Sequence, residues 1–332
     1  MRIAFYDAHK YEKKIFDEMN EKFRHDITYF DFQLNENTCM TAKDFDVVCV
    51  FVNDTLNDTV IKQLKEFNIK MIALRCSGFN NIDLDSASKN GITVVRVPSY
   101  SPHAIAEHTI GLMLSLLRKL PQAYVRTRGA NFSLEGLIGR ELFEKTIGII
   151  GTGQIGKVTA EILKGFGCNI MLYDIYQDHK WADKNGFFYY PLQEVLQSSD
   201  IITLHCPLTD QTKHLINFGS VNLLKKNCII INTSRGALIE TTALIKALKL
   251  KKIAGAALDV YEEENTFFFT DWSDEILNDD TLARLLTFPN VIITSHQAFL
   301  TEEALKAIAT TTLKNISDFD KKETLSNIVL TA

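Results

Sequence analysis

Residues 146–156, T-I-G-I-I-G-T-G-Q-I-G, restrict the folds open to this chain more than any other stretch. An apolar run typical of a buried strand leads into Gly151-x-Gly153-x-x-Gly156 and then into a helical pattern. The first glycine permits a tight strand-to-helix turn, the second lets a phosphate approach the backbone, and the third allows helix and strand to pack closely. The helix N-terminus adds unpaired N–H groups and a partial positive charge. The pattern predicts a dinucleotide pyrophosphate site.

The next strand-like run, residues 168–174, ends in Asp174, 18 residues after Gly156. An aspartate at this point can accept hydrogen bonds from the ribose hydroxyls and repel a 2′-phosphate. We therefore expect NAD rather than NADP. Glycine-rich turns also close ordinary strand-helix junctions, so the prediction rests on strand, turn, helix and acid occurring in this order.

Length and charge narrow the class of protein. A chain of 332 residues exceeds the size at which one core usually stops growing, so two domains are expected. The net charge of -5 argues against a nucleic-acid surface and against a basic membrane-binding face. Six cysteines, without a C-x-x-C pair and mostly in apolar runs, indicate neither a disulfide framework nor a metal site. With no apolar stretch of about 20 residues, we expect a cytoplasmic protein without membrane contact.

Strand-like and helical stretches alternate along most of the chain, which predicts an α/β fold with parallel sheets. The strand-like runs of the first part are residues 3–6, 47–52, 71–74 and 93–97, with a helix at 57–67 among them. A proline-bounded segment at 98–102 breaks this pattern, and a long apolar helix is expected at 104–120. After a loop-like segment, a second series of strands begins at residue 146 and continues at 201–204, 228–232, 254–258 and 291–294.

A last helix is expected after Thr301, an N-cap residue followed by two glutamates. Its apolar residues, Leu305, Ile308, Ala309, Leu313 and Ile316, recur at helical spacing. No strand follows, so the helix must pack on a domain that is already built. We therefore expect a discontinuous first domain, 1–100 plus 299–332, a nucleotide-binding domain at 101–298, and a ligand site in the cleft between them.

Three polar residues follow consecutive strand-like runs of the second series: Arg235, Glu264 and His296. Ligands of parallel sheets bind beyond such strand ends. Arginine can hold a carboxylate through two hydrogen bonds, and a carboxylate beside a histidine favours its charged form. Together they suit the reduction of a 2-oxoacid. Each residue also has an ordinary interpretation: a turn arginine, one acid of a solvated run at 262–264, and a structural histidine.

Several longer motifs resemble the NAD-dependent D-isomer-specific 2-hydroxyacid dehydrogenases over the whole chain. These are L-R-C-S-G-F-N-N-I-D (74–83), V-P-S-Y-S-P-H-A-I-A-E-H (97–108), G-T-G-Q-I-G (151–156), H-C-P-L-T (205–209), N-T-S-R-G (232–236), A-L-D-V-Y-E-E-E (257–264) and H-Q-A-F-L-T-E-E-A-L (296–305). The resemblance implies two doubly wound parallel-sheet domains, a flavodoxin-like substrate domain and a Rossmann NAD-binding domain.

The same resemblance implies a catalytic triad. Arg235 would bind the substrate carboxylate or carbonyl, His296 would donate a proton to the carbonyl oxygen as NADH delivers hydride, and Glu264 would keep His296 protonated. The backbone N–H groups of Ser77 and Gly78 would cradle the carboxylate.

Further contacts are implied by resemblance alone. Tyr100 would reach the substrate, and Phe299, with Phe51 as a weaker candidate, would narrow the pocket at its methyl end; either phenylalanine could equally belong to a core. The remaining cofactor contacts would come from Gln154, Ile155, Cys206, Pro207, Thr212, Thr233, Ser234, Arg235 and Asp259, the last at the nicotinamide amide. The family is commonly dimeric or tetrameric, so we expect a homodimer or homotetramer, with the 104–120 helix as a possible subunit contact.

Two departures from the family pattern bear on the substrate. Many members have proline before the catalytic histidine and threonine after it, where this chain has Ser295 and Gln297. The H-Q-A-F-L-T segment instead resembles the fermentative branch, which implies reversible reduction of pyruvate to D-lactate. Another 2-oxoacid remains the close alternative, because an apolar pocket discriminates by only about 1–3 kcal/mol per methylene. An NADH-sensing corepressor-like protein, which would bind the cofactor with negligible turnover, is the alternative from a different class.

Overall fold

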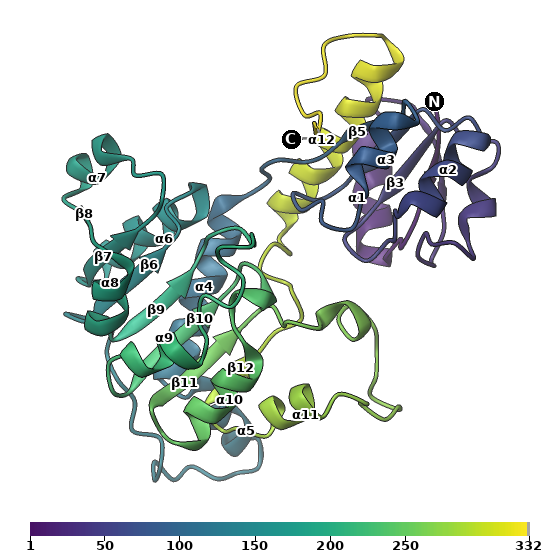
Figure 1. Cartoon of the computed structure of the whole chain (residues 1–332). Coiled ribbons are helices and arrows are strands. Elements are labelled where there is room, and N and C mark those ends of the chain that lie inside the picture. The colour runs from purple at the N-terminus through teal and green to yellow at the C-terminus, as the bar shows by residue number, and fades with distance from the viewer. Residues whose placement is uncertain (331–332) are drawn as a thin grey trace. The chain divides into compact units, whose positions relative to one another are not determined.

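The computed structural model describes residues 1–330, which form two compact units (Figure 1). The first unit comprises Met1–Ser101 together with the chain from Leu300 onward, and the second comprises Pro102–Phe299. The chain thus leaves the first unit once and later returns to it. Both changes of unit fall one residue later than the boundaries expected from the sequence.

The first unit is built on a five-stranded, wholly parallel sheet. Its strands are β1 (Arg2–Phe5), β2 (Asp26–Tyr29), β3 (Val47–Val50), β4 (Met71–Leu74) and β5 (Thr93–Val95), in the order β2-β1-β3-β4-β5. This is the flavodoxin-like order, in which the direction of winding reverses between β1 and β3. All residues of β3 and β4 are buried, as expected for central strands covered on both faces.

Helices cover this sheet. They are α1 (Lys10–Asn20), η1 (Cys39–Ala42), α2 (Asp58–Glu66), α3 (Leu84–Lys89) and α12 (Glu302–Asp320). Figure 1 shows the yellow helix α12 beside α1, and α12 also contacts β4. The Thr301 side chain caps α12 by accepting a hydrogen bond from the Ala304 N–H, and the apolar residues expected on its inner face are buried. The C-terminal segment is therefore a structural part of the first unit.

The second unit contains a seven-stranded parallel sheet. Its strands are β6 (Thr146–Ile150), β7 (Asn169–Tyr173), β8 (Phe188–Tyr189), β9 (Ile201–Leu204), β10 (Cys228–Asn232), β11 (Ile253–Leu258) and β12 (Val291–Ile293), in the order β12-β11-β10-β9-β6-β7-β8. The order reverses between β6 and β9, as in a Rossmann sheet. The two doubly wound parallel domains expected from the sequence are confirmed.

The helices of the second unit are α4 (Pro102–Leu117), α5 (Leu120–Arg128), α6 (Gln154–Gly165), α7 (His179–Asn185), α8 (Leu192–Ser198), α9 (Phe218–Leu223), α10 (Thr241–Lys249) and α11 (Asp280–Leu286), with short 3-10 turns η2 (Gly236–Leu238) and η3 (Glu264–Thr266). The helix expected at 104–120 is α4, which begins two residues earlier and ends at Leu117, and a separate helix, α5, begins at Leu120. Lys119 adopts a left-handed conformation with φ 54°, which ends the first helix, and Pro121 lies in the first turn of the second.

Helix α4 is also not available as a subunit contact along its apolar face. Its residues Ile110, Leu112, Met113 and Leu117 are buried in the core cluster that includes Leu163 of α6. Exposed apolar side chains instead follow α4, in α5 and in the segment up to residue 143. The expectation that the 104–120 helix itself faces another subunit is wrong for this face, because the side chains that suggested it complete the unit's own core.

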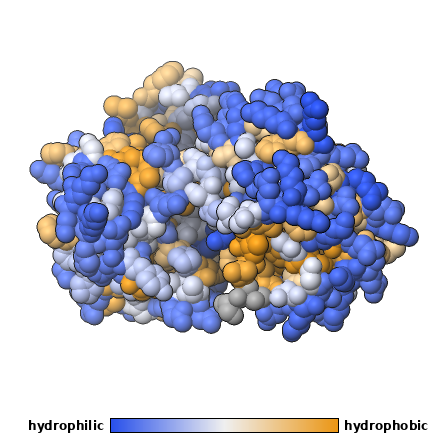
Figure 2. Space-filling view, turned by 90° about the horizontal axis from the view of Figure 1, so that it is seen from above, coloured by the Kyte–Doolittle hydropathy of each residue, from blue (hydrophilic) through white to orange (hydrophobic). Residues whose placement is uncertain are grey.

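Hydrophilic residues dominate the face shown in Figure 2, with smaller hydrophobic areas between them. A folded protein ordinarily keeps such apolar areas on its surface. Within residues 1–330, no helix combines the length and the apolar character needed to cross a bilayer.

A buried ion pair stabilises the first unit beneath the end of β4. The Arg75 side chain is fully buried and donates from Nε to Glu12 Oε1 at 2.8 Å and from Nη2 to the Asp7 carbonyl at 2.7 Å. Its guanidinium lies 4.3 Å from the ring centroid of Phe5 and 5.0 Å from that of Phe51. Glu12 therefore neutralises a charge that no solvent reaches.

Glu12→Gln should lower the free energy of unfolding by about 3–5 kcal/mol, because it leaves the buried Arg75 charge without its counter-ion. Urea unfolding of the whole chain measures this loss. The double variant Glu12→Gln/Arg75→Met removes both charges and should lose less than Glu12→Gln alone. A double variant that is the less stable of the two would show that packing around Arg75, rather than charge pairing, dominates.

Candidate active site and cofactor turn

The glycine-rich turn joins β6 to α6, and two of its glycines are required by close packing. Gly151 has φ +97°, and a Cβ placed on it would lie 2.5 Å from the Cys206 backbone nitrogen. A Cβ on Gly156 would collide with the carbonyl oxygen of Gly151. Both positions therefore exclude side chains, and the turn can pass directly beneath the end of β9 at the point where the sheet order reverses.

Gly153 differs from Gly151 and Gly156 because the space beside it is open. A side chain at this position would fill that space. A Cβ added there would meet nothing within 4 Å. Gly153 is the N-cap of α6, and within residues 1–330 the N–H groups of Gly153 and Ile155 donate to no protein acceptor. An anion approaching Gly153 would therefore meet unpaired donors and the positive end of the helix dipole. This arrangement fits the pyrophosphate of a dinucleotide.

Asp174 follows β7, and its carboxylate accepts hydrogen bonds from the glycine turn. Its Oδ2 accepts from the Thr152 backbone N–H at 2.6 Å and from the Thr152 hydroxyl at 3.1 Å, and its Oδ1 accepts from the Tyr176 N–H at 2.9 Å. The Thr152 hydroxyl also contacts that of Tyr189 at 2.9 Å. Asp174 thus orders the turn besides standing where the ribose is expected. Thr152 was not singled out from the sequence, although its place inside the G-T-G motif was a signal.

The cofactor contacts expected at Cys206, Pro207, Thr212, Thr233 and Ser234 belong to two connected loops. The Ser234 hydroxyl donates to the Cys206 carbonyl at 2.7 Å, and the Thr212 hydroxyl donates to the Pro207 carbonyl at 2.7 Å. Thr233 is joined to Thr109 of α4 by a hydroxyl contact of 2.8 Å. Burial raises the pKa of the Cys206 thiol to about 11, so this cysteine stays protonated at neutral pH. The structure therefore brings these loops together at the ends of β9 and β10.

Arg235, Glu264 and His296 follow three neighbouring strands. β10, β11 and β12 are adjacent and parallel, so their carboxyl ends lie along one edge of the sheet. Arg235 follows β10, Glu264 lies in η3 beyond β11, and His296 follows β12. The topology accordingly places the three predicted residues at the same edge.

His296 and Glu264 are in direct contact. His296 Nδ1 lies 2.8 Å from Glu264 Oε1, and the second oxygen of Glu264 accepts from the Tyr261 N–H at 2.8 Å. Both side chains are mostly buried, with 20% and 15% exposure. Within the described chain, Nε2 of His296 has no hydrogen-bond partner. The glutamate thus orients the ring, and the ring presents its other nitrogen to a ligand.

Phe269 lies beside this pair, with its ring centroid 5.8 Å from that of His296. It has a left-handed backbone, φ 67°. Sequence reasoning did not select it, because the three successive phenylalanines at 267–269 do not reveal which ring turns toward the histidine.

Arg235 is held through the backbone around it. Its Nη1 donates to the Ser234 carbonyl at 2.7 Å, and its own carbonyl accepts from the Asn232 side-chain amide at 2.8 Å. The following Gly236 packs directly against the Tyr261 backbone, where a Cβ would collide. Nε and Nη2 of Arg235 make no hydrogen bond within residues 1–330. This part of the guanidinium remains available to a carboxylate.

The Asp259 carboxylate anchors the loop that carries His296. It has no solvent exposure. Its Oδ1 accepts from the Thr294 hydroxyl at 2.5 Å and from the Gln297 N–H at 2.9 Å, and its Oδ2 accepts from the Ala298 N–H at 2.8 Å. The Asp259 carbonyl also accepts from the His296 N–H at 2.7 Å. A contact with the nicotinamide amide remains a prediction; what the residue does in the structure is position the histidine loop.

Asp259 stays ionised despite its burial. Burial by itself acts to raise the pKa of this carboxyl, but the hydrogen bonds from His108, Thr294, Ala298 and Gln297 outweigh it, so the pKa lies below its ordinary value. His108 Nε2, on α4, is 3.4 Å from Asp259 Oδ1 and 3.2 Å from the Thr294 hydroxyl. His108 stood in the A-E-H motif, yet nothing local in the sequence connects it with residues 259 and 294.

The predicted substrate residues outside this sheet edge are divided between the units. Ser77 and Gly78 follow β4 of the first unit, and within residues 1–330 neither backbone N–H has a partner. Tyr100, also of the first unit, is partly buried. Phe299 is 8% exposed and belongs to the second unit. The role of each in binding a substrate stays a prediction.

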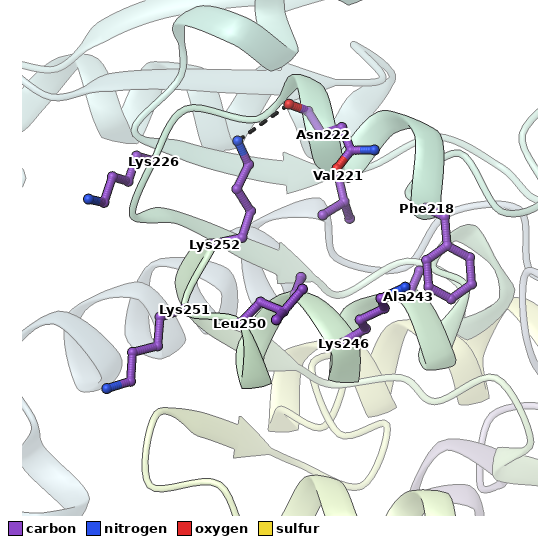
Figure 3. Close-up of a pocket in the computed structure, with 10 residues that line it drawn as sticks. Phe218, Val221, Asn222, Lys226, Ala243, Lys246, Leu250, Lys251 and Lys252 are labelled. Atoms are coloured by element: carbon purple, nitrogen blue, oxygen red, sulfur yellow. Dashed lines mark hydrogen bonds between the residues drawn. The ribbon is translucent and has the colours of Figure 1, made fainter.

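A surface pocket of about 580 Å³ in the second unit lies apart from these residues. It is lined by Phe218, Val221, Asn222, Lys226, Ala243, Lys246, Ala247, Leu250, Lys251 and Lys252 (Figure 3). The ammonium groups do not converge: Lys226 and Lys251 point outward in Figure 3, and Lys252 already donates to the Asn222 carbonyl. The pocket includes none of the predicted site residues.

Asp259→Asn should lower the free energy of unfolding at neutral pH by about 1–3 kcal/mol, because one amide oxygen cannot replace two carboxylate acceptors of buried N–H groups. The folded pKa is depressed, so the carboxylate stabilises the fold above its ordinary pKa of about 3.9 and loses this effect only as pH falls through the lower value. The loss in the variant should therefore be the same across neutral pH.

Urea unfolding, together with hydrogen exchange at the Gln297 and Ala298 amides, measures this effect. Asp210→Asn, at an exposed position of the same unit, is the matched control. Exchange at both amides as slow as in the wild type would remove Asp259 from its proposed anchoring role.

Comparison with known proteins agrees with this geometry. The family description "D-isomer specific 2-hydroxyacid dehydrogenase, NAD binding domain" matches residues 110–298. D-lactate dehydrogenase of Escherichia coli is 48% identical over 98% of this chain and 99% of its own, and an aromatic 2-oxoacid reductase of Clostridium sporogenes is 44% identical over 98% of each.

The solved structure of the Chlamydomonas reinhardtii pyruvate reductase superposes with a TM-score of 0.93 at 42% identity, covering 98% of both chains. The matched domain lies within the second unit, and it contains the glycine turn, Asp174, Arg235, Glu264 and His296. The chain belongs to the NAD-binding D-isomer-specific 2-hydroxyacid dehydrogenases.

Proposed function

We propose that the protein reduces a small 2-oxoacid, pyruvate above others, to the D-2-hydroxyacid with NADH, and catalyses the reverse reaction. One observation carries the proposal: Glu264 holds Nδ1 of His296 at 2.8 Å, while Nε2 is left without a protein partner in the described chain. A general acid needs this combination, in which one nitrogen is fixed by a carboxylate and the other faces the group that receives the proton.

In this mechanism His296 holds the transferable proton on Nε2 and gives it to the substrate carbonyl oxygen. Glu264 stabilises the positively charged ring before transfer. Arg235 and the N–H groups of Ser77 and Gly78 bind the substrate carboxylate and so orient the carbonyl carbon. When bound, the nicotinamide supplies the hydride. In the reverse direction His296 takes the hydroxyl proton.

The preference for pyruvate rests on apolar side chains. Phe299 and Phe51 are the proposed wall at the methyl end, and both are more than nine-tenths buried. Phe51 is also held in place, since its N–H donates to Asp54 at 2.6 Å and its carbonyl accepts from Asn81 at 2.8 Å. A phenylalanine fixed at the methyl end would favour a small substrate, although a larger 2-oxoacid remains the alternative because each methylene changes the preference only modestly.

We further propose a homodimer or homotetramer. A run of exposed apolar side chains supports this: Leu120, Tyr124, Val125, Phe132, Leu134, Ile138 and Phe143 are all at least half exposed. Singly exposed apolar residues are ordinary, but seven within residues 120–143 indicate a surface that a second copy covers. In a two-fold symmetric contact the same patch of both copies would be covered.

The cysteines support a cytoplasmic location. All six are free thiols, and five of them are buried. Unpaired thiols of this kind are typical of proteins from a reducing compartment.

Leu134→Glu combined with Ile138→Glu should convert the oligomer to the mass of one chain, because two carboxylates would be buried unpaired in the contact. Light scattering after size exclusion measures the mass. Ile276→Glu, at a position 78% exposed outside residues 120–143, should leave the mass unchanged. A wild-type protein that already has the mass of one chain would contradict the oligomer.

Initial rates of NADH oxidation with pyruvate, 2-oxobutyrate, 2-oxoisocaproate, hydroxypyruvate and glyoxylate test the proposed reaction. We expect the highest kcat/KM with pyruvate, because the apolar wall fits a methyl group. His296→Gln should reduce kcat by at least about 10²-fold while NADH still binds, since it removes the general acid. A maximum with another substrate would replace pyruvate, and wild-type protein that binds NADH without oxidising it would favour a sensor.

A further inference from the structure

In the loop after β4, the backbone carbonyl groups accept hydrogen bonds, whereas successive backbone N–H groups do not donate any within the described chain. Every carbonyl oxygen from residue 76 to residue 79 accepts a hydrogen bond from within the first unit. The donors are the Val97 N–H to Cys76 at 3.1 Å, Arg96 Nη1 to Ser77 at 2.9 Å, Cys76 Sγ to Gly78 at 3.2 Å, and the Ile82 N–H to Phe79 at 3.4 Å. The peptide planes of this loop are therefore fixed from their carbonyl side.

The amide side of the same peptides is unpaired. The N–H groups of Ser77, Gly78 and Phe79 donate to no acceptor among the residues that the structure describes. Successive free N–H groups form an anion-binding concavity when their carbonyls are tied elsewhere. The proposed function places the substrate carboxylate at the first two of these groups, and the carbonyl anchors determine which way they face.

Among the four anchors, Arg96 is the strongest candidate for control of the loop. A thiol is a weak donor, whereas a guanidinium donates a charge-assisted hydrogen bond. The Ser77 carbonyl belongs to the peptide whose N–H is that of Gly78, so the bond from Arg96 fixes one of the two proposed carboxylate donors directly. The guanidinium also lies 5.0 Å from the ring centroid of Phe79, which belongs to the same loop.

Arg96 is itself rigidly held by the C-terminal part of the chain. Its N–H donates to the Asn327 carbonyl at 3.1 Å, and its carbonyl accepts from the Asn315 side-chain amide at 3.1 Å. Asn327 and Asn315 are joined by a side-chain bond of 2.8 Å. Asn315 is buried on α12. The returning C-terminal segment thus determines the position of an arginine that in turn determines the position of the loop.

The charge of Arg96 is not neutralised locally. Within residues 1–330 it makes no ion pair, and the acceptor that its side chain finds is the Ser77 carbonyl. A half-buried cation beside a row of free N–H groups favours an anion on that row. We propose that Arg96 is a positioning residue for the substrate carboxylate: it fixes the Ser77–Gly78 peptide and adds positive potential to the donors. This inference rests on the proposed function.

Arg96→Met tests it, because methionine keeps apolar packing on Phe79 while removing the donor and the charge. Pyruvate KM should rise by about tenfold or more, as expected for loss of a charge-assisted bond, with kcat and the NADH dissociation constant within about threefold of wild type. Arg96→Lys keeps the charge and a donor and should restore part of the KM. Arg2→Met, at an exposed arginine of the same unit, is the control and should leave KM unchanged.

Binding of oxamate to the NADH complex, followed by nicotinamide fluorescence, gives a readout that does not need turnover. Arg96→Met should weaken oxamate binding by the same factor as it raises KM. A variant that lowers the melting temperature and kcat but leaves KM and oxamate affinity unchanged would make Arg96 merely structural and overturn the inference. Failure of the wild type to reduce any 2-oxoacid would refute the proposed function instead, and the oxamate comparison would still decide the role of Arg96.

Discussion

The carboxylate of Asp259 is the contact on which the arrangement at the end of β11 and β12 depends. This carboxylate is a fully buried anion, and burying its charge would be costly without hydrogen-bond donors around it. The donors are the backbone N–H groups after His296, the hydroxyl of Thr294 and the ring of His108. Each donor fixes a different element. The carboxylate therefore joins α4, the end of β12 and the histidine loop into one rigid group.

This anchoring explains how His296 keeps an uncommon backbone conformation. Its φ is 52°, in the left-handed region that costs a residue with a side chain about 1 kcal/mol or more. Histidine is among the side chains found there more often than average. The N–H groups on either side of the turn are held by Asp259, so relaxation to an ordinary conformation would break hydrogen bonds to a buried charge. The ring is consequently presented to Glu264 at a fixed angle, and its Nε2 faces away.

The sequence predicted those parts of the site that are local in the chain. The glycine turn and Asp174 lie within one strand-helix-strand unit, so their spacing alone indicated the dinucleotide fold. Arg235, Glu264 and His296 each lie beyond the carboxyl end of a strand, and parallel strands must align their ends. Other contacts could not be predicted in this way. His108 and Asp259 are in contact although they are 151 positions apart in the sequence. The hydrophobic pattern of a helix does not show which distant carboxylate one of its polar side chains will contact.

The apolar residues of 104–143 show why hydrophobicity in the sequence does not by itself separate a core helix from an exposed surface segment. Residues 104–120 and 120–143 both carry many apolar side chains, and only the three-dimensional packing distinguishes them: Met113 is buried in the core, whereas Ile138 is 87% exposed. The left-handed Lys119 marks the change. Before it, the helix follows the sheet and fills the space beside α6; after it, the chain turns away from that core. A side chain such as Ile138 then stays in contact with water, and this exposure is the observation behind the proposed contact with a second copy.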